Sequence, residues 1–255
     1  MPAKLPALFV GHGAPTLALD EEKGAPLRTW GRTLPRPRAV LVVSAHWEEA
    51  PVTLGTVQTS PLVYDFYGFP EPLYGVTYPA PGAPELAGRV VDLLGTGLVD
   101  RRPERGLDHG VWTPLVHMFP DHDVPVLQLS MPSALGAKAV FGLGDRLAPL
   151  RSEGVLLVGS GNITHNLRAM GPEGRAPESW AVDFDRWVRD RLVDRDVDGL
   201  LAYRERAPAF ERNHPSEDHW LPLLFTLGAA SGDKASFPVE GFEHQNLSRR
   251  AVQLG

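Results

Sequence analysis

The chain has 255 residues, of which 25 are basic and 31 acidic, so its formal charge is −6 at neutral pH. This acidic balance argues against a protein that binds nucleic acid or an anionic membrane, because such proteins carry a basic patch or stripe. The sequence has no cysteine, which excludes disulfides, thiol nucleophiles and cysteine-ligated metals. A bound metal would therefore be held by His, Asp or Glu.

The hydrophobic pattern predicts a soluble, cytoplasmic protein. The longest apolar runs, such as residues 39–43, are much shorter than the roughly 18 residues that span a bilayer. The first residues hold one Lys and lack the long apolar run of a secretory signal. We expect a monomer or small homo-oligomer whose partners include neither nucleic acid nor membrane.

Apolar runs along the chain alternate between strand-like and helix-like patterns. Short runs rich in β-branched residues predict strands, and longer amphipathic runs predict helices. Strands are expected at 7–10, 39–44, 52–57, 124–129, 155–158 and 247–254. Helices are expected at 85–94, after residue 110 through 116, and at 133–147, 179–193 and 216–227. This alternation predicts a single α/β domain over 1–255, with a central, mostly parallel sheet and helices on both faces.

Three of the predicted strands lead into a histidine. His12 follows the first strand, His46 follows the second, and His165 comes soon after the strand at 155–158. Ligands bind at the carboxyl ends of strands in open α/β sheets, so these side chains are expected at one edge. A single histidine there is more often a hydrogen-bonded structural residue, but three at equivalent positions favour a functional site.

Two further histidines have unusual settings. His109 precedes a helix-like segment that Asp108 could cap. His219 is expected in the first turn of the last long helix, which Ser216 could cap. The positive end of a helix dipole disfavours an imidazolium, and neutral imidazole is the form that binds a metal.

A metal is the simplest reason for several neutral histidines to converge. Three His on Zn²⁺ with one open position would make a hydrolytic site. Ferrous iron with three protein ligands on one face would leave adjacent positions for a substrate and O₂. A noncatalytic metal- or phenol-binding protein could use the same cluster. The spacing of the histidines leaves these readings open.

The segment 61–78 is rich in aromatic residues, prolines and glycines. It is interpreted either as ordinary aromatic core or as a wall or lid over a planar substrate, since offset stacking suits ring ligands. In the second interpretation Asp65 and Tyr67 supply polar contacts, and Phe69 is part of the aromatic wall.

Six segments, in order along almost the whole chain, carry a family resemblance. They are Gly11-His12-Gly13-Ala14-Pro15, Ser44-Ala45-His46-Trp47, Tyr64-Asp65-Phe66-Tyr67-Gly68-Phe69-Pro70, Leu107-Asp108-His109-Gly110, Gly159-Ser160-Gly161-Asn162 with His165-Asn166-Leu167, and His214-Pro215 with Asp218-His219-Trp220-Leu221-Pro222-Leu223. With these segments the sequence resembles the DODA-type extradiol aromatic ring-opening dioxygenases of the class III, LigB-like superfamily.

The resemblance implies a role for each histidine. It implies that His12, His46 and His219 bind the metal, with Fe²⁺ expected for dioxygenase activity and Zn²⁺ possible in the same site. His165 would be the catalytic acid/base, and His109 would line the pocket and contact the substrate. The implied reaction opens the ring of a catechol, such as a DOPA-like compound, with O₂.

Many class III enzymes use two His and one Glu, so the third ligand has competitors here. Glu217 and Asp218 stand beside His219. Residues one or two apart on a helix point in different directions, so only one of the three is expected to face the metal. We expect that residue to be His219.

Overall fold

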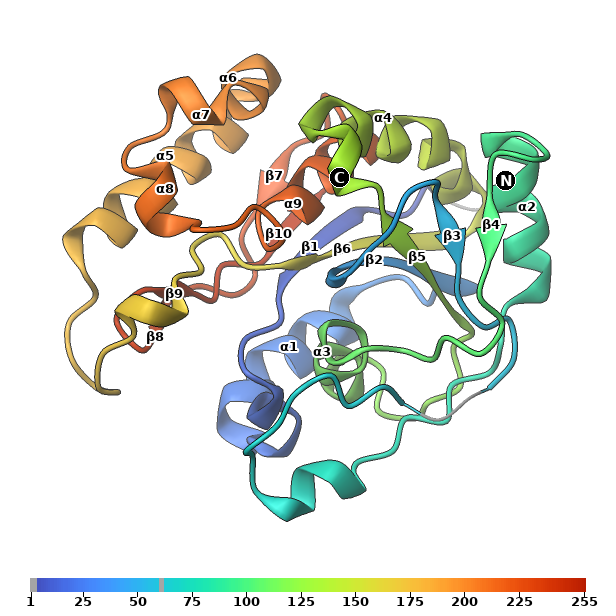
Figure 1. Cartoon of the computed structure of the whole chain (residues 1–255), viewed down its shortest axis with the longest axis horizontal. Helices are drawn as coiled ribbons and strands as arrows, with labels where there is room; N and C mark the ends of the chain where they lie inside the picture. The colour runs from blue at the N-terminus through green and yellow to red at the C-terminus, as the bar shows by residue number, and fades with distance from the viewer. Residues whose placement is uncertain (1–3, 60–61) are drawn as a thin grey trace.

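The computed structural model describes residues 4–59 and 62–255, and one large sheet runs through it (Figure 1). Its strand order is β4-β3-β5-β2-β6-β1-β10-β7. These strands are β1 (Ala7–Gly11), β2 (Ala39–Glu48), β3 (Thr53–Leu54), β4 (Asp100–Arg101), β5 (Val126–Met131), β6 (Val155–Gly161), β7 (Ala235–Ser236) and β10 (Val252–Leu254). A separate antiparallel ribbon pairs β8 (Phe242–Glu243) with β9 (Leu247–Ser248).

The middle of the sheet is parallel and its edges are mixed. β5, β2, β6 and β1 are neighbours and pair in parallel. β10 is antiparallel to both β1 and β7, and β3 is antiparallel to β5. The central strands therefore deliver their carboxyl ends to one edge, as the predicted mostly parallel sheet requires.

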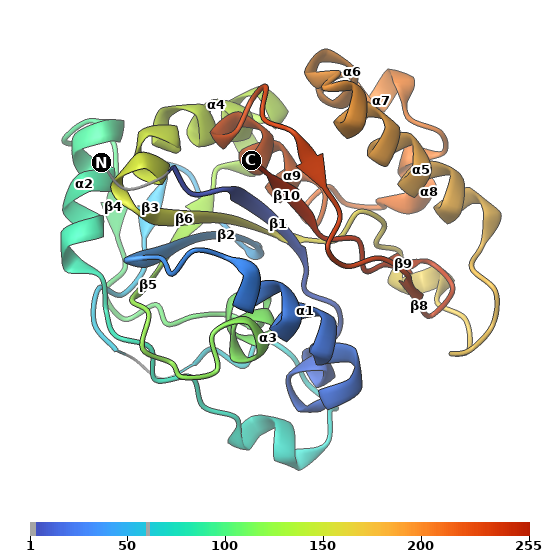
Figure 2. The ribbon, with the colours of Figure 1, turned by 180° about the vertical axis from the view of Figure 1, so that it is seen from behind.

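Helices cover both faces of this sheet (Figures 1 and 2). The α-helices are α1 (Glu21–Thr33), α2 (Pro84–Leu94), α3 (His109–Met118), α4 (Ala137–Leu147), α5 (Ser179–Asp194), α6 (Val197–Leu201), α7 (Tyr203–Arg206), α8 (Phe210–Asn213) and α9 (Leu221–Ala229). Short 3₁₀ helices are η1 (Pro15–Leu19), η2 (Glu71–Gly75), η3 (Ser133–Leu135), η4 (Ala148–Glu153) and η5 (Leu167–Ala169). The predicted single-domain α/β fold is confirmed.

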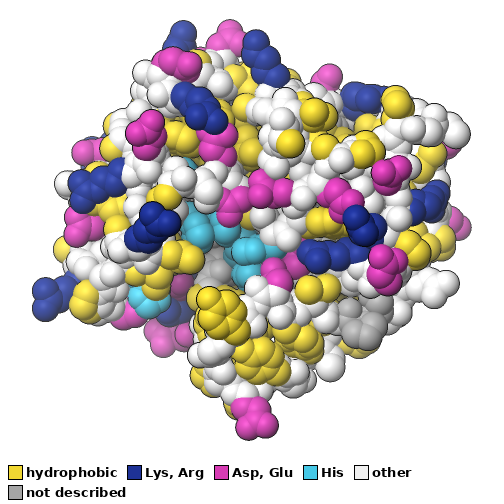
Figure 3. All heavy atoms as spheres, viewed as in Figure 1, with side chains coloured by type: hydrophobic (Ala, Val, Ile, Leu, Met, Phe, Trp, Pro, Cys, Tyr) yellow, Lys and Arg dark blue, Asp and Glu magenta, His cyan; other side chains and the backbone are white. Residues whose placement is uncertain are grey.

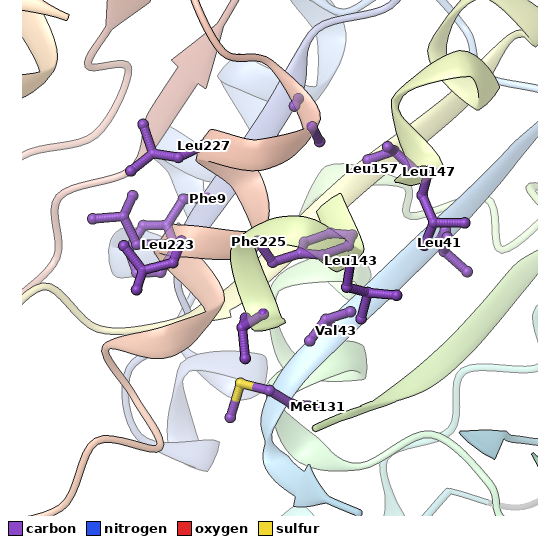
Figure 4. Packing of buried hydrophobic residues seen from close by; sticks show 14 of the residues in the cluster. Phe9, Leu41, Val43, Met131, Leu143, Leu147, Leu157, Leu223, Phe225 and Leu227 are labelled. Carbon is purple, nitrogen blue, oxygen red and sulfur yellow. The ribbon is translucent and has the colours of Figure 1, made fainter. Parts of the chain in front are cut away.

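Alternate residues of the central strands pack into two hydrophobic cores, one on each face of the sheet. On one face Phe9, Leu41 and Leu157 pack with α4 and α9, where Leu143 and Phe225 are buried (Figure 4). Side chains alternate between the faces of a strand, so their neighbours point the other way. That opposite core contains Leu8, Val42 and Val158 of the strands, with residues of α1 and α3. Both faces of the sheet are therefore covered, which keeps the central strands rigid.

Several predicted boundaries were wrong. The strand expected at 39–44 continues to Glu48, so His46 lies within β2 rather than beyond it. The strand expected at 52–57 is only Thr53–Leu54. The helix expected at 133–147 is divided into η3 and α4, because Gly136 has a φ of 82° between them. The strand expected at 247–254 is two short strands, β9 and β10, in different sheets.

The last long helix begins later than expected. It starts at Leu221 rather than Ser216, and the Ser216 hydroxyl donates to the Asp218 carboxylate instead of capping the helix. His219 therefore lies in the turn that precedes α9, not in its first helical turn.

Helix α1 was not predicted. The run contains Pro26 and two glycines, which obscure a helical pattern. It forms because Asp20 accepts a hydrogen bond from the Lys23 backbone N–H and because Leu27 and Trp30 are buried. Among residues 4–59 and 62–255, no helix is long and apolar enough to cross a membrane.

Candidate metal centre

The centre of the site is built on neighbouring strands. Val10 pairs with Ser160, and Ser160 pairs with Ser44 on its other side. His12 and His46 each follow two residues beyond this row, so both lie at the carboxyl edge of the sheet. The Nε2 atoms of the two rings face each other at 3.0 Å.

The motif that ends β6 holds this edge together. The Ser160 hydroxyl lies 2.9 Å from Nδ1 of His12 and also donates to the carbonyl of Gly110. A Cβ on Gly161 would lie 2.2 Å from the carbonyl oxygen of His219, so only glycine allows this approach. The backbone N–H of Asn162 then donates to that same carbonyl at 3.0 Å. The Gly-Ser-Gly-Asn motif therefore holds two of the predicted ligands, His12 and His219, in place.

The hydrogen bonds of His12 assign its tautomer. The single hydroxyl proton of Ser160 is given to Gly110, so the Ser160 oxygen accepts from Nδ1–H of His12. The Nε2 atom of neutral His12 then carries a lone pair. It is this atom that faces His46.

His219 is oriented in the same way by a carboxylate. Its Nδ1 lies 2.7 Å from Oδ2 of Asp218, which can only accept, so Nε2 again carries the lone pair. Carboxylates that fix a histidine through its second nitrogen are a regular feature of metal sites. Glu217, the other competitor, instead accepts from Tyr203 at 2.8 Å and pairs with Arg204 at 2.7 Å.

Ligand atoms of His12, His46 and His219 all lie within 4.8 Å of one another. His219, rather than Glu217 or Asp218, completes this group. His46 Nδ1 faces Asp65 Oδ2 at 3.5 Å, so its Nε2 is also the atom free to bind a metal. Lone pairs that face each other at 3.0 Å repel, and a cation between them removes that repulsion. The donor set therefore fits a metal ion.

Burial keeps these rings neutral. It lowers the pKa of His12 and His219 well below the usual histidine value, and the neighbouring histidines lower it further. Burial and His109 likewise lower the pKa of His46. Burial acts to raise the pKa of Asp218, but the hydrogen bond from His219 outweighs it and this pKa falls far below its usual value. Neutral imidazoles beside an ionised carboxylate are the state that binds a cation.

His109 and His165 flank the three-histidine group. The His109 ring lies 3.9 Å from that of His46, and the His165 ring stacks on His219 at 3.5 Å and 9°. Burial lowers the pKa of His165 to about 4. Among the described residues, neither ring nitrogen of His165 has a hydrogen-bond partner, and the ring belongs to no metal-binding group.

Asp108 does not cap α3 with its side chain as predicted. It occupies the N-cap position, but its carboxylate accepts from Ser44 at 2.8 Å and from the Gln128 amide. The backbone N–H of His109 donates instead to Oδ1 of Asp65, at 3.1 Å. A residue from a distant segment therefore replaces the local cap.

The aromatic segment combines packing and exposure. Its described part begins at Leu62, so Pro61 lies outside the described residues. Tyr64 and Phe66 pack on Trp112, and Phe66 also meets the His109 ring edge-on at 5.7 Å. Tyr67 is 92% exposed. The base of the segment is therefore aromatic core and its Phe66 borders His109, while a wall or lid over a substrate stays a prediction.

Histidine side chains reach the surface on one face of the molecule. Figure 3 shows a group of them near the centre of that face, with acidic side chains above and hydrophobic side chains below. A polar, histidine-lined centre bordered by apolar surface suits a small aromatic ligand.

Comparison with known proteins identifies the family. Residues 8–255 match the model for the catalytic LigB subunit of aromatic ring-opening dioxygenase. The chain belongs to this LigB family. This membership confirms the predicted resemblance and the enzyme class, an extradiol ring-cleaving dioxygenase.

Curated relatives and a solved structure share nearly the whole chain. The 4,5-DOPA dioxygenase extradiol of Escherichia coli K12 is 42% identical over 99% of this chain and 95% of its own length. The Beta vulgaris protein of the same name is 42% identical over 87% of this chain and 85% of its own length. The crystal structure of an uncharacterized Escherichia coli K12 protein superposes with a TM-score of 0.85 at 39% identity, covering 98% of this chain and all of that one.

Sequence reasoning missed the residues that orient the ligands. Ser160 was read only as part of a motif, and Asp218 only as a competing ligand. The signal for Asp218 was its place next to His219, since carboxylates commonly hold the second nitrogen of a metal-binding histidine. Ser160 had no comparable signal, because its contact with His12 joins residues 148 positions apart.

Proposed function

We propose that this protein opens the ring of a catechol-type compound beside its two hydroxyls, using O₂ and a ferrous ion held by His12, His46 and His219. The observation that carries the proposal is the convergence of three neutral imidazoles whose Nδ1 atoms face Ser160, Asp65 and Asp218. Family membership gives the reaction type, and the three-nitrogen set suits iron or zinc.

Bound iron would supply Lewis acidity and the one-electron chemistry that O₂ requires, with positions left open by three ligands on one face. Zn²⁺ fits the same donors but has no redox chemistry. The relatives named 4,5-DOPA dioxygenase support a substrate with a 3,4-dihydroxyphenyl group. We propose that residues 1–255 act as one catalytic domain.

His165 is proposed as the acid/base. Its ring stacks on His219, and its backbone is held by the bond from its N–H to Asn213 O at 3.0 Å. With both ring nitrogens free, it is suited to take a proton from a substrate hydroxyl and later return one.

His109 is proposed to orient the substrate oxygens. Its Nδ1 is bound to Asp65 at 2.8 Å, so its Nε2 is left for the site. Substrate contacts of Asp65, Tyr67 and Phe69 stay predictions, with Tyr67 and Phe69 belonging to the aromatic segment that borders the histidines.

The test is an anaerobic purification followed by Fe²⁺ loading. Catechols bearing different substituents are then screened for O₂ uptake and for the yellow absorbance of ring-opened products, with metal content measured in parallel. We expect activity with Fe²⁺ and none with Zn²⁺. A Zn²⁺-loaded protein that hydrolyses esters or amides, with an inert Fe²⁺ form, would refute the proposal.

A further inference from the structure

Asp65 lies between two histidines that come from different parts of the chain. Its Oδ1 accepts from Nδ1 of His109 at 2.8 Å and from the His109 backbone N–H at 3.1 Å. Its Oδ2 faces Nδ1 of His46 at 3.5 Å. Both oxygens are thus directed at protein groups, and the side chain is only 20% exposed.

We propose that Asp65 is a positioning residue, which fixes the tautomers of His46 and His109 together so that both Nε2 atoms present lone pairs to the site. This inference rests on the proposed function, in which His46 binds the metal and His109 orients the substrate. A carboxylate can only accept hydrogen bonds, so Nδ1 of His109, which is bonded to Asp65 at 2.8 Å, carries the proton. The negative charge 3.5 Å from Nδ1 of His46 favours a proton on that nitrogen in the same way. One residue therefore prepares a metal ligand and a substrate-orienting histidine at once.

The aromatic segment gives Asp65 a fixed place. The two residues before Asp65 are held by hydrogen bonds. The Val63 N–H donates to Leu107 O at 2.8 Å, and the Val63 carbonyl accepts from the Trp112 indole at 3.3 Å. The Tyr64 hydroxyl donates to Val76 O at 2.6 Å. The packed base of the segment therefore has a function of its own, which is to hold this carboxylate against the histidines.

The variant that tests the inference is Asp65→Asn, which keeps the shape and removes the charge. The amide oxygen can still accept the hydrogen bond from Nδ1 of His109, but the NH₂ group then faces Nδ1 of His46 and would donate to it. His46 would then carry its proton on Nε2, the nitrogen proposed to bind the metal. Loss of such a supporting contact costs about 10- to 100-fold in metal affinity or activity.

The matched control is Glu71→Gln, an exposed carboxylate in η2 of the same segment. Histidine tautomers are read from ¹⁵N NMR of the metal-free protein, and metal affinity from equilibrium dialysis with Fe²⁺ under nitrogen. Thermal unfolding shows that each variant is folded. Asp65→Glu, which keeps an acceptor-only group, should recover part of the lost affinity.

We expect Asp65→Asn to shift the ¹⁵N signals of His46 or His109 and to raise the metal Kd about 10- to 100-fold, with kcat falling more than KM rises. Glu71→Gln should match the parent. Unchanged tautomers and metal affinity together with a raised KM would overturn the inference and make Asp65 a substrate contact. Failure of the proposed function is separate, because a parent inactive on every catechol would leave the tautomer and dialysis results valid.

Discussion

Replacement of His165 by Ala should separate metal binding from chemistry. The variant loses a ring stacked at 3.5 Å on His219, while the backbone hydrogen bond to Asn213 is retained. A stacked ring pair contributes about 0.5–1.5 kcal/mol. At a factor of ten for each 1.36 kcal/mol, the metal Kd should rise by about 2- to 12-fold at most.

The expected loss of turnover is much larger. A general acid–base residue typically contributes about 10²- to 10⁴-fold in rate, which is about 2.7–5.4 kcal/mol. The assay therefore measures Fe²⁺ bound per chain and kcat at saturating metal, for the parent and His165→Ala on one accepted catechol. His122→Asn is the control, because His122 has a φ of 54° that Asn tolerates and lies outside the site.

Two results would refute this reasoning. If His165→Ala loses its metal at concentrations that saturate the parent, His165 is a ligand. If it keeps both metal and kcat, His165 takes no part in proton transfer and only forms the pocket wall.

Three further outcomes are expected. His12→Ala should lose most bound metal and all activity, while its unfolding midpoint changes little; full metal occupancy would contradict the assignment. Gly159→Ala would place a Cβ 2.1 Å from Pro222 O, so urea unfolding should show a loss of about 1–3 kcal/mol, and a parent-like stability would be contrary to this packing. Burial acts to raise the pKa of Asp233, but the hydrogen bond from Arg151 outweighs it and the pKa is lowered. A carboxyl whose pKa is lower in the folded protein than in the unfolded chain stabilises the fold at pH values above the unfolded pKa, and this contribution is lost as the pH falls through the folded pKa. Asp233→Asn should therefore be less stable than the parent at pH 7, with the difference vanishing in acid. A difference that stays constant with pH would argue against this reasoning.

The arrangement of the central strands could be predicted because their signal is local. Runs such as 39–43 and 155–158 are short and β-branched, and burial on both faces produces just that pattern. The carboxyl-edge rule then predicts that His12, His46 and His165 lie together at one edge of the sheet.

The misplaced helix start shows where local reasoning fails. Ser216 has the chemistry of a cap, but its hydroxyl is engaged by the side chain of Asp218. The stronger signal was Pro222, which favours the first turn of a helix and lies one residue after the observed start at Leu221. Competing side-chain contacts of this kind are not encoded in residue preference.

The supporting shell of the site was beyond sequence reasoning for a different reason. Asp65 is 44 positions from His109, and Ser160 is 148 positions from His12. Such pairings depend on how the whole chain folds, and nothing in the local pattern marks them. Motif resemblance predicts the ligands, whereas only the structure shows which residues contact them.

The most direct test of the account is a single-turnover measurement on the anaerobic, Fe²⁺-loaded protein. An excess of protein is mixed with a catechol and a known amount of O₂, and both O₂ uptake and product are followed. We predict one O₂ consumed per catechol and a yellow product opened beside the two hydroxyls, with no reaction in the Zn²⁺-loaded control. A ring opened between the hydroxyls, or no O₂ uptake with Fe²⁺ bound, would contradict the account.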